Sequence, residues 1–68
     1  MKNKILKAAL LHFQAEKATA EANLEIYLKN STGVAEHPNI VTEVINLTRA
    51  IAESDECIKA LETYKEKK

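Results

Sequence analysis

Very few of the 68 residues could interrupt a helix, or stabilise a small domain through a disulfide or a bound metal. The sequence contains one glycine, one proline, one cysteine and no tryptophan. A single cysteine excludes a disulfide within these residues, and one thiol with two histidines is short of the four ligands of a structural zinc site. A domain of this size is marginally stable unless a staple or a partner contributes. Because the sequence offers neither a disulfide nor a zinc site, self-association is the favoured source of additional stability.

An excess of charge and a long apolar run are also missing. Ten basic and ten acidic residues balance to zero, so no overall field draws the chain toward nucleic acid or a membrane surface. The longest apolar run covers only residues 8–11, against the ~20 residues that a membrane span needs. The apolar stretch that ends at Phe13 has no small-residue cleavage site, so we expect a helix there and no signal peptide. Together with the unpaired thiol, this favours a cytoplasmic protein without a membrane segment.

What remains is dominated by helix-forming residues on both sides of one interruption. Residues 2–30 are rich in Ala, Leu, Glu and Lys, and residues 38–66 resemble them. The sequence therefore predicts one all-α domain, residues 1–68, with helices at 2–30 and 38–66 joined by a turn at 31–37. In that turn Gly33 can adopt the left-handed conformation that closes a helix, and Pro38 suits a first helical turn. Glu36 or His37 would then take the cap position. The predicted turn and cap residues are Asn30, Gly33, Val34, Glu36, His37 and Pro38.

The apolar residues of both predicted helices follow the alternating four- and three-residue spacing of a coiled-coil seam. If the chain folds back on itself near residue 34, the two sets face each other in an antiparallel hairpin, with Phe13 opposite the small Ser54. Lys17 falls on the seam opposite Ile51, where its methylene stem can cover apolar surface while its ammonium stays in water. The predicted seam residues are Leu6, Leu10, Phe13, Ala20, Leu24, Tyr27, Ile40, Val44, Leu47, Ile51, Ile58 and Leu61.

Further apolar residues lie outside the seam, and a two-helix hairpin alone cannot bury them. Their burial against a partner at ~25 cal/mol per Å² would add several kcal/mol. We therefore expect a homo-oligomer, in the first place a dimer that forms a four-helix bundle of parallel or antiparallel orientation. The alternative is that the alanines are ordinary exposed helix formers. The predicted oligomer face consists of Leu11, Ala15, Ala18, Ala22, Ile26, Val41, Ile45, Cys57 and Tyr64.

No group of residues has the spacing of a catalytic or metal site. His12 and Cys57 fall at similar heights of the hairpin, and a thiol beside an imidazole is how cysteine nucleophiles are activated. However, a helix pair offers no oxyanion hole, so we expect a surface histidine and a half-buried thiol. Di-metal bundles use Glu-x-x-His pairs, and neither histidine follows a glutamate at that spacing. We therefore expect no catalytic residue, no metal and no cofactor.

The residues around the turn follow a recognisable pattern: a helix ends in Tyr-x-x-Asn, a Gly-Val turn follows, and Glu-His, a proline and an amide residue open a second helix. The residues that carry this pattern are Tyr27, Asn30, Gly33, Val34, Glu36, His37, Pro38 and Asn39. Through them, residues 26–62 resemble a family of small uncharacterised proteins of tailed bacteriophages, including phages of marine cyanobacteria. The resemblance covers about half of the chain; Ser31 departs from the proline common in that family, and Asn39 replaces the more common aspartate. The resemblance implies phage origin and a helical hairpin, and it implies no activity for any residue.

These observations favour a non-enzymatic helical-hairpin protein that acts through self-association and protein–protein interaction. Such a protein could contact a host protein in the cytoplasm of the infected cell or serve as a virion or assembly accessory, and its partner is not identified by the sequence. The alternative is a small nucleic-acid-binding modulator that uses the lysine-rich open end of the hairpin. The neutral net charge counts against that alternative. An enzyme would need a pocket and an activated pair, which the pattern does not provide.

Overall fold

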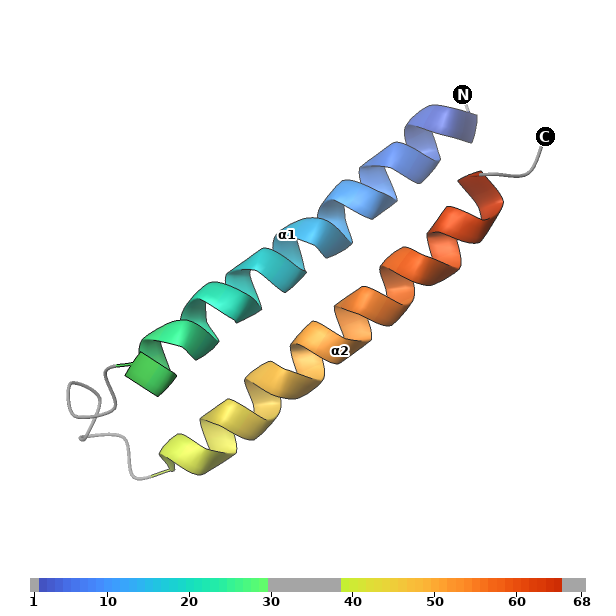
Figure 1. The fold of residues 1–68 in the computed structure, drawn as a ribbon. Coiled ribbons are helices and arrows are strands. Elements are labelled where there is room, and N and C mark those ends of the chain that lie inside the picture. The colour runs from blue at the N-terminus through green and yellow to red at the C-terminus, as the bar shows by residue number, and fades with distance from the viewer. Residues whose placement is uncertain (1, 30–38, 66–68) are drawn as a thin grey trace.

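The protein is a straight two-helix hairpin (Figure 1). A computed structural model describes residues 2–29 and 39–65. Helix α1 covers Lys2–Lys29 and helix α2 covers Ile40–Lys65, and the two pack side by side in antiparallel orientation. Together they form a rod of 50 × 15 × 15 Å, with both ends of the chain at the same end of the rod. The structure thus confirms the predicted all-α hairpin.

The second helix begins two residues later than the sequence predicted. Asn39 lies in a turn, and its carbonyl oxygen accepts a hydrogen bond of 3.0 Å from the amide of Glu43. This is the first bond of α2, so Asn39 occupies the N-cap position, for which asparagine is a favoured residue. The prediction favoured Pro38 because proline suits a first helical turn, but the asparagine that follows it is the stronger start signal. The predicted turn and cap residues, Asn30 to Pro38, lie outside the described part of the chain.

The core of the hairpin is the seam between α1 and α2. Leu10, Ala20 and Ser54 are its buried residues, with 7%, 5% and 3% of their surface exposed. All twelve residues predicted to form the seam are buried or half-buried. The two most buried residues, Ala20 and Ser54, have small side chains, and larger side chains occupy the other seam positions.

This core is thin. Among the described residues, no large side chain is completely buried, because each helix has a neighbour on one side only. Seven large apolar side chains within residues 2–29 and 39–65 remain exposed to solvent. They are Ile5, Leu11, Ile26, Leu28, Val41, Ile45 and Tyr64. A single seam therefore leaves much of the apolar content of the chain in contact with water.

Candidate interaction surfaces

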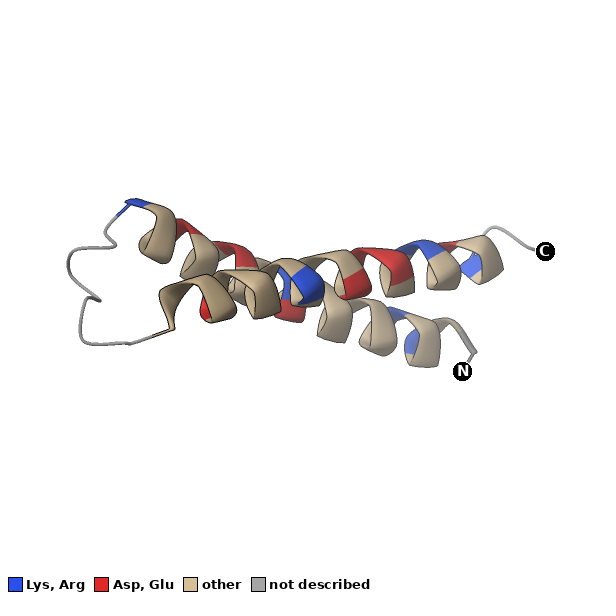
Figure 2. Cartoon of the chain, turned by 90° about the horizontal axis from the view of Figure 1, so that it is seen from below, with Lys and Arg blue, Asp and Glu red and all other residues tan. Residues whose placement is uncertain are grey.

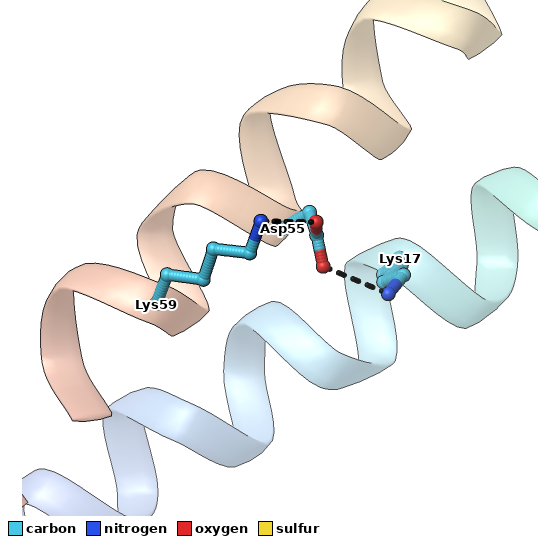
Figure 3. Close-up of polar contacts among 3 residues, drawn as sticks. All are labelled: Lys17, Asp55 and Lys59. Atoms are coloured by element: carbon cyan, nitrogen blue, oxygen red, sulfur yellow. Dashed lines mark hydrogen bonds and ion pairs between the residues drawn. The ribbon is translucent and has the colours of Figure 1, made fainter.

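A cluster of three charged residues links the two helices near the middle of the rod (Figure 3). The ammonium of Lys17 on α1 donates a hydrogen bond of 2.9 Å to Oδ1 of Asp55 on α2. The ammonium of Lys59, one turn further along α2, lies 3.6 Å from Oδ2 of the same carboxylate. Asp55 thus holds one cation with each oxygen.

The cluster stabilises the charged forms of its members. The hydrogen bond from Lys17, followed by its positive charge, lowers the pKa of Asp55 below its ordinary value. The same bond and the charge of Asp55 raise the pKa of Lys17. Both side chains are a third or more exposed, so solvent screens the attraction. Lys17 was predicted to hold its ammonium in water, and the structure instead places it on Asp55.

Asp55 also marks one side of the hairpin. Residues seven apart are two turns apart and lie on the same side of a helix. Val41 precedes Asp55 by fourteen residues, and Ile45 precedes Lys59 by fourteen, so these two apolar residues lie on the side of the charged cluster. On α1, Leu28 and Glu25 line a surface hollow with Ile51 of α2 on this side. We call this side the Asp55 face; its exposed apolar members are Leu11, Ala18, Leu28, Val41, Ile45 and Ala52.

The opposite side, the His12 face, carries an open groove between the helices. Its floor is made of small residues, including Ala20, Ala50 and Ser54, and its rim is polar, with Glu16 and Glu53. His12 lies on this rim and places its Nε2 3.1 Å from Oε2 of Glu16, one turn further along α1. The imidazole also meets the ring of Phe13 edge-on, with 5.0 Å between ring centroids. The groove is a feature that sequence analysis missed, although small residues at seam positions of both helices, Ala20 and Ser54, indicate it.

Toward the end of the rod that carries the termini, the same side becomes apolar. Ile5, Leu6 and Ala9 of α1 form a hollow with Leu61 and Tyr64 of α2. Ile5 and Tyr64 have more than half of their surface exposed. Ile5 was not among the residues predicted for the oligomer face.

The structure divides the predicted oligomer face between the two sides of the hairpin. Val41 and Ile45 lie on the Asp55 face, whereas Cys57 and Tyr64 repeat at seven-residue spacing from Ala50 of the His12 groove. Cys57 is half-buried, and the other eight members of the predicted face are exposed. The predicted residues therefore do not form one continuous surface.

Charge is separated along the rod (Figure 2). Among the described residues, 2–9 and 57–65 hold five lysines and one glutamate, a net charge of +4, and 10–29 and 39–56 hold seven acidic and three basic residues, a net charge of −4. In the picture, lysine segments occupy the end that carries both termini, and acidic segments concentrate along the middle of the rod. We call the lysine-rich end the open end.

The remaining chemical expectations concern metal and membrane. Within residues 2–29 and 39–65, no group of three histidine, cysteine or carboxylate side chains is placed to hold a metal ion. Neither helix of the described chain has an apolar stretch long enough to cross a membrane.

Comparisons with protein-family models, with curated proteins and with solved structures found no match to this chain.

Proposed function

We propose that this chain is a non-enzymatic helical-hairpin protein that acts through self-association and through contact with another protein. The observation that carries the proposal is the set of seven large apolar side chains exposed on the described residues. A hairpin of this size benefits from covering them. Full burial of a leucine, isoleucine or valine contributes about 1.5–3 kcal/mol, and these side chains, which are 45–71% exposed, would gain part of that.

The dimensions of the rod suit such a contact. One long side of 50 by 15 Å presents about 750 Å², close to the ~800 Å² per partner of a standard interface. Two hairpins laid side against side would form a four-helix bundle, in which each helix gains a second neighbour. The resemblance of residues 26–62 to phage proteins supports a setting in an infected cell or a virion, where the dimer would dock on a host or assembly protein.

The first experiment is the absolute mass of the 7.6-kDa chain by light scattering over a dilution series at low and high salt. We expect a dimer that persists at high salt, because burial of apolar surface does not depend on charge attraction. Replacing Val41 and Ile45 together by serine should shift the equilibrium toward monomer, while Thr42→Ser and Asn46→Ser, the matched controls beside them, should not. A folded monomer at every concentration would overturn the proposal of self-association.

A second candidate function is nucleic-acid binding by the lysines of the open end, which Figure 2 shows gathered at one pole of the rod. Such binding would fall steeply with salt, since each phosphate contact releases counterions. A filter-binding titration with duplex DNA and structured RNA at two salt concentrations tests it. Binding that is abolished by Lys4→Ala and Lys7→Ala together, with the dimer intact, would favour this function over protein contact.

A further inference from the structure

On the Asp55 face, α1 carries charged and apolar residues in an order that is complementary to the same order reversed. Lys4, Leu11, Ala18 and Glu25 follow one another at seven-residue spacing and are all exposed, so they form a single stripe along the helix. We call it the Leu11 stripe. Read from either end, it has a charged residue, two apolar residues and a charge of opposite sign. Its midpoint lies between Gln14 and Ala15.

This pattern is unfavourable for α1 on its own. The first turn of α1 contains no acidic residue, and lysines occupy positions 2, 4 and 7, whereas Glu16 is the first acidic residue of the chain. Lysines near a helix N-terminus oppose the helix dipole. The fold adds Lys59 and Lys65 of α2 at the same end of the rod, which increases the repulsion. The dipole of α1 and the charge of the neighbouring α2 lysines therefore both disfavour this position for the lysines.

We propose that two copies of the chain pack antiparallel through the Leu11 stripes of their α1 helices. This inference rests on the proposed self-association and specifies its orientation and contact. In an antiparallel pair centred on the stripe midpoint, Lys4 of each copy lies opposite Glu25 of the other, and Leu11 lies opposite Ala18. Each contact occurs twice because the arrangement is two-fold symmetric.

A parallel pair of α1 helices would instead place Lys4 against Lys4 and Glu25 against Glu25. It would also bring together the two open ends, whose described residues 2–9 and 57–65 each carry a net charge of +4. The antiparallel pair lays the lysines of residues 2–9 along residues 20–27 of the other copy, which include Glu21 and Glu25 and no basic residue. In the single hairpin Glu25 forms an exposed ion pair of 3.2 Å with Lys29, and a second cation from the partner can join it on the solvent side.

Orientation can be measured with one spin label per chain. Thr63 is exposed near the open end of α2, and Thr63→Cys on a Cys57→Ser background gives a single attachment point. In the antiparallel pair the two labels lie about twenty residues apart in height, or ~30 Å along the rod at 1.5 Å per residue. In a parallel pair they lie at equal height, within ~20 Å, given interhelical distances of 8–10 Å. Pulsed dipolar spectroscopy separates these distances.

Charge reversal tests the contact itself. Lys4→Glu and Glu25→Lys should each weaken the dimer by about tenfold, since each reversal turns two exposed attractions into repulsions. The double variant should recover most of the affinity. Arg49→Glu, which makes the same change in charge outside the α1 stripe, is the matched control and should leave the affinity unchanged. Circular dichroism of dilute Lys4→Glu should show helix content at least equal to that of the wild type, because the change favours the dipole of α1.

The outcomes separate this inference from the proposal on which it rests. A dimer with the long label distance and recovery in the double variant supports the antiparallel pair. A dimer with the short distance, or without recovery, overturns the antiparallel pair and leaves self-association standing. A chain that stays monomeric at every concentration overturns both.

Discussion

At the scale of single residues, Lys17 and Asp55 are the most informative pair. A lysine at a seam position is a local disadvantage, since the seam otherwise excludes charge. The structure resolves it by placing the ammonium 2.9 Å from a carboxylate of the opposite helix. A polar residue at a seam position commonly fixes the register between helices, and this pair is placed to do so for α1 and α2.

The pair predicts a dependence of stability on pH. The pKa of Asp55 is lowered, so its contribution is present above the unfolded value of about 3.9 and is lost as the pH falls through the lowered value. The pKa of Lys17 is raised, so its contribution is lost only in strong alkali. Thermal melting of the wild type and Asp55→Asn should differ by a constant amount between about pH 5 and 9, and the difference should shrink below about pH 4. A difference that persists unchanged at pH 2 would contradict this account.

Ser54 offers a second test at this scale. With 3% of its surface exposed, it is the most buried of the described residues, so a much larger side chain there must displace its neighbours in the seam. Ser54→Leu should lower the free energy of unfolding by about 1–3 kcal/mol through overpacking, measured by urea titration. Ser54→Ala, which keeps the volume, serves as the control and should be tolerated. Equal stability of the leucine variant would show that the seam is looser at this point.

At the scale of the helices, two neighbouring apolar residues of α2 should respond differently to the same change. Leu47 is half-buried in the seam, whereas Ile45 is 45% exposed on the Asp55 face. Leu47→Asp buries a charge between the helices and should abolish most of the helical signal in circular dichroism. Ile45→Asp should leave the helices of the hairpin folded and weaken self-association, measured by light scattering. Similar loss of helicity in both variants would show that α2 does not have distinct inner and outer sides.

Much of the helical arrangement can be predicted from sequence because it depends on spacing. The four- and three-residue alternation from Leu6 to Leu61 follows directly from helix geometry, and so does the antiparallel register. The hydrogen bond between Lys17 and Asp55 could not be predicted from spacing, because it depends on the directions of the two side chains as well as on residue order. The sequence analysis did not predict that the oligomer face is divided between two sides of the hairpin, although the residue spacing on α2 indicates it. Val41 and Cys57 are sixteen residues apart, which is not a multiple of seven and places them on different sides of α2.

At the scale of the whole molecule, the proposed association would add stability that the thin core of one hairpin lacks. A ligand that binds only the folded state raises its apparent stability by mass action, and a second copy of the chain acts in the same way. The midpoint of thermal unfolding should therefore fall on dilution, by several degrees over a hundredfold range for a domain of this size. Scanning calorimetry at high concentration and circular dichroism at low concentration measure it. A midpoint independent of concentration would mean that one hairpin is stable by itself.

The simple topology of the rod also sets the order in which it can form. Seam partners near the turn, such as Tyr27 and Ile40, are separated by a short stretch of chain, while Leu6 and Leu61 are separated by most of it. The entropy lost on closing a loop grows with its length, so the first contacts form beside the turn and later ones extend the seam toward the open end. On heating, the lysine-rich end opens first. Hydrogen exchange should therefore be fastest in the parts of α1 and α2 nearest the open end and slow progressively along both helices toward the turn.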